Sequence, residues 1–393
     1  MLRDLICSFF GRFPLLALSA EVLTCGPVAR AAEDWHPAQV PNGALAVHDR
    51  LPVAVVGGTA EEIGAAEGAL FADRVPPLLK LMAWQPKLVL QRRTTRFRTT
   101  LAAISAETRS RLTALAASSG VAAQTLLEAN ALVDAQCSAT VAMPHDGQPL
   151  RVARNMDFFP AGRLGPGTVL EIVRPAGQRP YASITWPGSA AVISGMNDAG
   201  LVACILLNHH GENLPGGEPI GLRLAAILAH ESDVAGAMKR FAATPVGSSQ
   251  YVLLADAQTT TIIWQTPEGL RQDQPRDGWL IASNGARRDG TPTDARGRFL
   301  DAQCRSHAGT ADQEWMRRAL TTCYMPGINA QAMVFEPATC TLELAVGTGV
   351  APAATAAWWR IPLAELLNGT RSAESAEVAS LTPCVPLPHY IND

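Results

Sequence analysis

The chain contains few charged residues and very little lysine. Charged residues make up 17% of its 393 residues, and lysine occurs only at positions 80, 87 and 239, whereas about 25% charged residues is usual in globular domains. The formal net charge is −3 and there is no long basic stripe, so we expect no nucleic-acid partner. Hydrophobic residues make up 48%, which argues against disorder and allows a large buried core.

The sequence also lacks the short motifs of several classes of enzyme. It has no G-x-S-x-G elbow, no papain-like C-G-x-C-W, no P-loop and no dinucleotide-binding fingerprint. No two cysteines have C-x-x-C spacing, which disfavours zinc and thioredoxin-like sites. His209 and His210 are adjacent and have no H-E-x-x-H pattern around them. We therefore expect no metal and no cofactor.

Long apolar runs are absent beyond the start of the chain. Residues 1–32 have the features of an export signal: Arg3 near the start, an apolar region over residues 9–23, and Ala29-Arg30-Ala31 as a small-x-small cleavage site. No other segment approaches 18 uninterrupted apolar residues, so we expect no membrane span. These features favour a periplasmic or secreted protein over a cytoplasmic one.

The most informative segment runs from Cys137 to Asp157. Residues 138–143 are apolar and β-prone, residues 144–147 (Pro-His-Asp-Gly) are typical of a turn, and residues 150–153 restart an extended run. This pattern predicts a hairpin whose return strand ends in Arg154-Asn155-Met156-Asp157. The two ends of such a hairpin lie side by side, so Arg154 and Asp157 should return to the neighbourhood of Cys137.

A thiol in this setting can act as a nucleophile. The reactive form is the thiolate, and the reference pKa of about 8.5 leaves little of it at neutral pH. If Cys137 were the first residue of a processed chain, its α-amino group could serve as the base. Arg154 would favour the thiolate, and Asp157 would orient the amine. The competing interpretation is a buried structural cysteine followed by a surface Arg-Asp pair.

The rest of the chain predicts an α+β protein. Before Cys137 the pattern is mainly helical, over residues 57–81 (with Thr59 and Glu62 as a capping box), 104–115 and 122–132. Strands, then helices, then strands again follow Cys137, which indicates sheets sandwiched between helices. We expect the following division: signal peptide 1–32, helical propeptide 33–136, catalytic domain 137–370 and C-terminal tail 371–393. The expected strands include residues 190–194.

With these segments placed, the chain resembles the acyl-coenzyme A:isopenicillin N acyltransferase family of autoproteolytic N-terminal nucleophile (Ntn) hydrolases. It resembles choloylglycine hydrolases and acid ceramidases more distantly. The resemblance covers roughly residues 51–350 and is carried by Gly57-Gly58-Thr59, by Cys137 with Arg-Asn-Met-Asp ending at 157, by residues 195–201 (GMNDAGL) and by residues 219–223 (PIGLR). It implies a four-layer αββα sandwich and self-cleavage between Gln136 and Cys137.

The resemblance also implies further site residues. Asn208 matches an oxyanion-hole position, Asn284 matches the asparagine that completes the site, and Arg298 matches a downstream arginine, a role for which Arg296 competes because the spacing is loose. The implied partners are a small-molecule acyl-amide substrate, an acyl-thioester donor if acyl transfer occurs, and the chain's own cleaved propeptide as a tightly associated chain. The family often has Gly and Thr where this chain has Gln136 and Ser138.

Six cysteines lie beyond the expected signal. We expect Cys204, in an apolar run, to be a buried free thiol, whereas Cys304, Cys323, Cys340 and Cys384 could form two disulfides. The leading hypothesis is an autoprocessed amidohydrolase or acyltransferase that forms an acyl-thioester on Cys137. The alternative is an exported binding protein that keeps the fold without self-cleavage.

Overall fold

The computed structural model describes residues 35–83, 94–131, 136–158, 164–211, 214, 216–307, 311–348 and 351–384. The expected signal peptide, residues 1–32, and the last residues of the expected tail, 385–393, lie outside this part of the chain. None of the described helices combines the length and the apolar character needed to cross a membrane.

Two sheets form the centre of the molecule. Ten described strands build the larger sheet, in the spatial order β1 (Ala38–Val40), β2 (Gly43–His48), β3 (Leu51–Gly58), β6 (Val169–Pro175), β7 (Tyr181–Thr185), β8 (Ser194–Asn197), β9 (Val202–Leu206), β10 (Tyr251–Ala255), β11 (Thr260–Thr266) and β12 (Gly269–Asp273). Seven build the smaller sheet, in the order β13 (Trp279–Ala282), β4 (Gln136–Ala142), β5 (Arg151–Asp157), β16 (Asn329–Glu336), β17 (Thr341–Val346), β18 (Trp358–Pro362) and β19 (Ala379–Leu381). Within these sheets only β3 and β6 are parallel.

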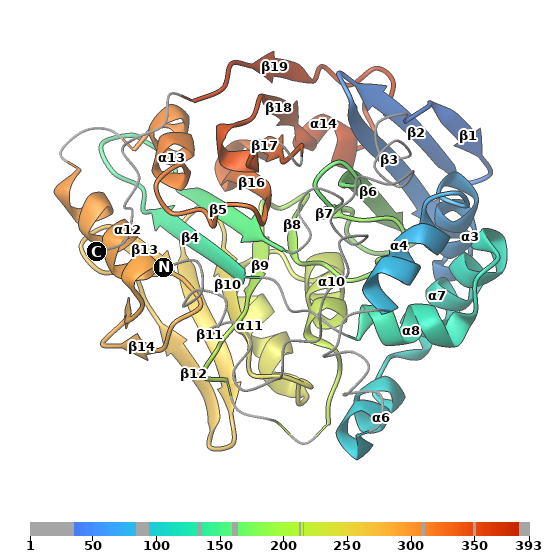
Figure 1. Ribbon diagram of the computed structural model, residues 1–393, viewed down its shortest axis with the longest axis horizontal. Helices are drawn as coiled ribbons and strands as arrows, with labels where there is room; N and C mark the ends of the chain where they lie inside the picture. The colour runs from blue at the N-terminus through green and yellow to red at the C-terminus, as the bar shows by residue number, and fades with distance from the viewer. Residues whose placement is uncertain are drawn as a thin grey trace, which may run out of the picture.

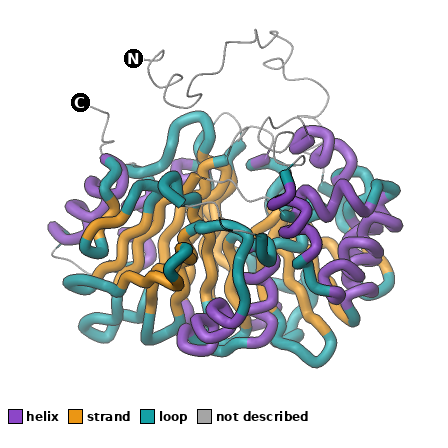
Figure 2. The backbone as a smooth tube through the Cα atoms, turned by 90° about the horizontal axis from the view of Figure 1, so that it is seen from below, coloured by secondary structure: helices purple, strands orange, loops and turns teal. Residues whose placement is uncertain are grey.

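Helices cover the outer faces of both sheets. The described helices are α3 (Ala60–Leu70), α4 (Val75–Ala83), α6 (Thr95–Ala102), α7 (Ala106–Ser119), α8 (Ala123–Asn130), α10 (Ile220–His230), α11 (Val234–Ala243), α12 (Ala295–Ser306), α13 (Gln313–Leu320) and α14 (Leu363–Leu367). Helices α10 and α11 contact β8, β9 and β10, whereas α12 and α13 contact β13, β4, β5 and β16. Strand β4 in turn contacts β9 of the other sheet. Figure 2 shows the strands in the interior with helices around them, and the predicted four-layer αββα sandwich is confirmed.

The segment before Cys137 is part of both a helical layer and the larger sheet. Its helices α3, α4, α7 and α8 gather beside β1, β2 and β3, on the opposite side of the molecule from α12 and α13 (Figure 1). The predicted capping box is confirmed, since Thr59 and Glu62 cap each other at the start of α3. The prediction of a mainly helical segment missed β1 and β2. Strand β3 pairs with β2 on one edge and with β6 on the other.

A buried ionic cluster ties this segment to the strands that follow Cys137. Arg111 on α7 forms ion pairs with Glu67 on α3 and with Glu171 on β6, the latter at 3.3 Å. It also donates to the Tyr181 hydroxyl on β7 at 3.0 Å. Burial raises the pKa of Glu171 well above its ordinary value, and the neighbouring Glu67 raises it further. The cluster therefore holds one arginine between two carboxyls, one of which favours its protonated form.

Several segments differ from the sequence prediction. The predicted helix over residues 57–81 is two helices, α3 and α4, with turns at residues 71–74 between them. Residues 190–193 are not a strand, and β8 begins only at Ser194. The expected tail contains β19, which pairs with β18. All six described cysteines are free and buried, including Cys204 as predicted, so the two disulfides suggested for the C-terminal cysteines are not formed.

Candidate functional site

The predicted hairpin brings Cys137 next to the end of its return strand. Strands β4 and β5 pair antiparallel with Gln136 opposite Asp157, Cys137 opposite Met156, and Ala139 opposite Arg154. Side chains of directly opposite residues share a face and alternate along a strand. Cys137 and Arg154 therefore share one face of the hairpin, while Asp157 lies on the other face. The backbone of Cys137 stands between the arginine and the carboxylate.

The sulfur of Cys137 contacts a fully buried guanidinium. Arg154 Nη2 donates to Cys137 Sγ at 2.9 Å, and Cys137 is 0% exposed. The other partners of this guanidinium are the carbonyl oxygens of Ile193 and Ile205, the hydroxyl of Ser194 and the thiol of Cys204. Among the described residues Arg154 forms no ion pair with a carboxylate. The buried positive charge is therefore placed to stabilise a thiolate.

Burial opposes that thiolate in the uncut chain. Removal from water raises the pKa of the Cys137 thiol, and the positive charge of Arg154 lowers it by less. Cys204, on β9, also contacts Arg154, but burial raises its pKa to about 11. The thiol of Cys137 thus needs a base before it can attack.

The backbone of Cys137 is held by Asn284 and Arg296. Asn284 Oδ1 accepts the Cys137 backbone N–H at 2.9 Å, and Asn284 Nδ2 donates to the carbonyl oxygen of Leu207 at 2.7 Å. Arg296 Nη2 donates to the Cys137 carbonyl oxygen at 2.6 Å and to Asn284 Oδ1 at 2.5 Å. The nitrogen and the carbonyl of Cys137 are both fixed by side chains from outside the hairpin.

Asp157 is buried among hydrogen-bond donors. Arg296 Nη1 donates to its Oδ2 at 2.5 Å, and Asn329 Nδ2 donates to its Oδ1 at 2.9 Å. The backbone N–H of Met325 is 3.3 Å from the same Oδ1. Burial raises the pKa of Asp157, while Arg296, Asn329 and Met325 oppose that shift. The donors keep a charged carboxylate possible in a buried position.

The arginine at this site is Arg296 and not Arg298. Asp294 caps the start of α12, so Arg296 lies in its first turn. Successive helical residues are rotated by about 100°, which points residues two positions apart in nearly opposite directions. Arg298 is exposed and donates to the Thr293 carbonyl oxygen. The structure thus brings Arg296, and not Arg298, to Cys137 and Asp157, and it favours Arg296 for the role that the resemblance gave to Arg298.

Asn208 lies beside the site but makes no described contact with Cys137. It follows β9 and is 8% exposed, and its Oδ1 accepts the His210 backbone N–H at 3.0 Å. Its Nδ2 donates to no acceptor among the described residues. The backbone N–H of His209 donates to the Asn284 carbonyl oxygen at 3.1 Å, which ties the end of β9 to Asn284.

Sequence reasoning missed Asn329. This residue opens β16, and it was overlooked because the polar residues Asn329 and Gln331 interrupt the apolar pattern at the start of that strand. No group of three or more potential metal-ligating His, Cys, Asp or Glu side chains occurs in the described part of the chain.

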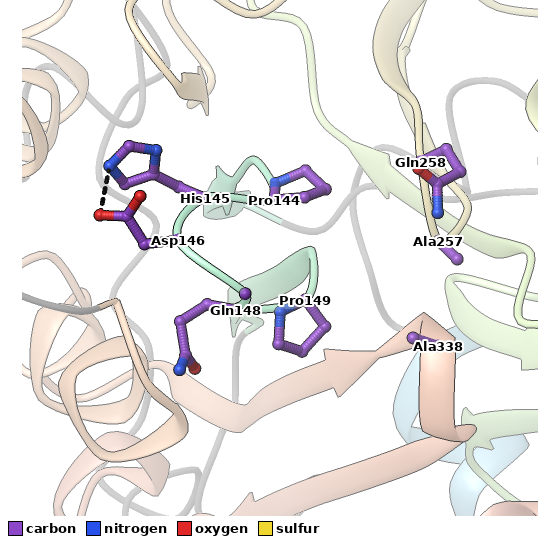
Figure 3. Close-up of a pocket in the computed structure, with 9 residues that line it drawn as sticks. Pro144, His145, Asp146, Gln148, Pro149, Ala257, Gln258 and Ala338 are labelled. Atoms are coloured by element: carbon purple, nitrogen blue, oxygen red, sulfur yellow. Dashed lines mark ion pairs between the residues drawn. The ribbon is translucent and has the colours of Figure 1, made fainter.

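A separate cavity of about 390 Å³ lies at the other end of the hairpin. Figure 3 shows it between the β4–β5 turn, with His145 and Asp146, and the neighbouring Gln258 and Ala338. His145 Nε2 and Asp146 Oδ2 lie 3.1 Å apart, and both side chains are exposed. This cavity has no residue in common with the surroundings of Cys137.

No family model matches the chain, and no curated protein matches it. Solved structures similar to the chain include an N-acylethanolamine-hydrolyzing acid amidase ortholog from Caenorhabditis elegans, with 14% identity and a TM-score of 0.44 over 51% of this chain and 93% of that one. A conjugated bile acid hydrolase from Clostridium perfringens has 11% identity and a TM-score of 0.39 over 65% and 99% of the chains. A penicillin V acylase from Agrobacterium tumefaciens has 15% identity and a TM-score of 0.34 over 64% and 99%. These similarities assign no activity to this chain.

Proposed function

We propose that the chain is the precursor of a cysteine Ntn amidohydrolase or acyltransferase that cuts itself between Gln136 and Cys137. The observation that carries the proposal is the pair of contacts made by Cys137. Its buried sulfur accepts from Arg154, and its nitrogen donates to Asn284. A structural cysteine needs neither contact, because a buried thiol packs as a small apolar group.

Self-cleavage would begin at the sulfur. The Cys137 thiol loses its proton and attacks the Gln136 carbonyl carbon, the C–N bond breaks, and the leaving nitrogen takes up a proton. A thioester between Gln136 and Sγ results, and one water hydrolyses it to a free carboxyl and a free thiol. Asp157, whose pKa burial raises, lies on the other face of the hairpin from the sulfur and suits a group that holds the proton at the departing nitrogen.

The processed chain would use its new α-amine as the base. A proton moves from Sγ to the amine and leaves a thiolate beside Arg154 and an ammonium within reach of Asp157. The two faces of the hairpin suit this charge separation, because the arginine and the carboxylate lie on opposite sides of the Cys137 backbone. The transfer creates two buried charges, and the positive charge of Arg154 beside the thiolate and the carboxylate of Asp157 near the ammonium would offset their desolvation cost.

Attack on the substrate would follow the same pattern. The thiolate adds to the acyl carbon of a linear amide, the amine leaves with the proton held by the ammonium, and an acyl-thioester forms on Cys137. Water releases the acid in hydrolysis, and an amine releases an amide in acyl transfer; an acyl-thioester donor would load the same sulfur. The Nδ2 of Asn208 suits an oxyanion donor, a role in which one lost hydrogen bond costs about 2.7 to 4 kcal/mol of barrier.

The segment before Cys137 would remain bound after the cut. Strand β3 lies between β2 and β6, and Arg111 pairs with Glu171 across the two pieces. We further propose that the protein is exported to the periplasm or secreted, on the basis of residues 1–32.

Intact mass of the purified chain tests the proposal. Wild type should give two fragments separated at Gln136 and Cys137, while Cys137→Ala should stay intact with the same fold. Uncut wild type with no labelling of Cys137 by a thiol-reactive acyl probe would instead support the non-catalytic binding protein.

A further inference from the structure

Asn329 stands opposite Asp157 because the strand that carries it contains a β-bulge. From Gln331 onward β16 pairs regularly with β5, with Gln331 opposite Met156 and Ala332 opposite Asn155. Continuing this register would put Ala330 opposite Asp157. The register shifts between Asn329 and Gln331, so Asn329 takes that place. Bulges occur next to active sites because they re-aim a side chain.

The re-aimed amide is held at both ends. Asn329 Nδ2 donates to Asp157 Oδ1 at 2.9 Å and lies 3.3 Å from Asn155 Oδ1. Its own Oδ1 accepts the backbone N–H of Ala354 at 2.8 Å, and the residue is 1% exposed. Because Ala354 fixes the oxygen end, the nitrogen end faces the carboxylate as a donor.

Asn329 also differs from the other groups around the carboxylate. Arg296 from α12, Cys137 from β4 and Cys323, which follows α13, are the charged or titratable groups that act on Asp157 in the described structure. Arg296 divides its donors among Asp157, Asn284 and the Cys137 carbonyl. Asn329 donates a hydrogen bond to Asp157 but carries no positive charge that would compete with Arg154 for the Cys137 thiolate.

We propose that Asn329 is a positioning residue that keeps Asp157 ionised and fixed in orientation during self-cleavage and catalysis. This inference rests on the proposed function, since it gives Asp157 the task of holding or carrying a proton. Removing the donor would favour the protonated carboxyl. Proton transfer at Cys137 would then fail at mildly acidic pH, where the carboxyl is protonated, and would recover at higher pH.

The test follows self-cleavage against pH. Full-length chain is made and pulse-labelled by cell-free synthesis, transferred to buffers between pH 5 and 8, and resolved on denaturing gels over time. We expect Asn329→Ala to be cut roughly tenfold more slowly than wild type at pH 5 and at nearly the wild-type rate at pH 8. Asn329→Asp preserves the shape but adds a second carboxylate, and it should be slower at both pH values.

Gln331→Ala is the matched control. Gln331 is a buried amide on the same strand, and it donates to Thr168 Oγ1 at 3.0 Å and not to Asp157. Its loss should lower the melting temperature without changing the shape of the pH profile. If Asn329→Ala and Gln331→Ala slow the cut equally at every pH, or if Asn329→Asp is cut like wild type, the role assigned to Asn329 is overturned and the proposed function stands. Uncut wild type would overturn the proposed function itself.

Discussion

Replacing Arg154 with methionine removes the charge that faces the nucleophile. The guanidinium is 0% exposed, and its Nη2 is 2.9 Å from Cys137 Sγ. Two unit charges about 4 Å apart at an effective dielectric constant of about 20 attract by about 4 kcal/mol. The thiolate and the transition state that leads from it would lose that energy, so self-cleavage should slow by about 10³-fold.

The variant should still fold, because two effects on stability oppose each other. The carbonyl oxygens of Ile193 and Ile205 lose their donor, and an unsatisfied buried group costs about 1–3 kcal/mol. Removing a buried cation that has no carboxylate partner among the described residues relieves a desolvation penalty of several kcal/mol. Methionine fills much of the same volume.

The assay is the rate of fragment appearance from labelled precursor, with thermal melting in parallel. Arg151→Met is the matched control on the same strand, because Arg151 is also buried but pairs with Glu336 at 2.9 Å, away from Cys137. Arg154→Lys should be intermediate, since one ammonium cannot reach the sulfur and both carbonyls together. Cleavage of Arg154→Met within threefold of wild type, or equal slowing of Arg151→Met, would refute the electrostatic argument.

Two further predictions follow from the placement of charges. Arg296→Ala should abolish self-cleavage measured on gels while Arg298→Ala should leave its rate unchanged, and equal effects would contradict the assignment. Burial raises the pKa of Glu171, so the folded state retains a proton that the unfolded state releases; stability is fully present below the ordinary pKa of the carboxyl and falls as the pH rises towards the raised value. Glu171→Gln keeps the neutral form, so its melting temperature should change less than that of wild type between pH 5 and 8; parallel curves for the two proteins would contradict this.

The hairpin was predictable from sequence because its signals are local. An apolar run, a Pro-His-Asp-Gly turn and a second run place Arg154 and Asp157 near Cys137 without any tertiary information. The partners of Arg154 were not predictable, because Ser194 and Ile205 lie in the other sheet, Ile193 directly precedes its strand β8, and all three bind through backbone carbonyls or a hydroxyl. Every residue has a backbone carbonyl, so the amino-acid sequence cannot indicate which carbonyls will accept from Arg154.

Other parts of the fold were missed for equally specific reasons. Strand β8 contains Gly195, where a Cβ would lie 2.6 Å from the Ala182 carbonyl oxygen and 2.9 Å from a methyl group of Leu228 on α10. The close approach of the Ala182 backbone on β7 requires glycine, and glycine weakens the local strand signal. Arg296 and Arg298 could be separated only by knowing where α12 begins, and Asp294 settles this through its cap. The bulge at Asn329 has no sequence signature of its own.

Strand β3 has a consequence for the lifetime of a cut molecule. While the chain is continuous, bringing β3 between β2 and β6 is an intramolecular event with a high effective concentration. After a cut at residue 136, β3 and β6 would belong to different polypeptides, and refolding would require two dilute chains to meet. The native arrangement would then persist through a slow rate of unfolding, and denaturation would become practically irreversible. The covalent link that directs the assembly of β3 between β2 and β6 would therefore act only once, when the precursor folds, before the first catalytic turnover.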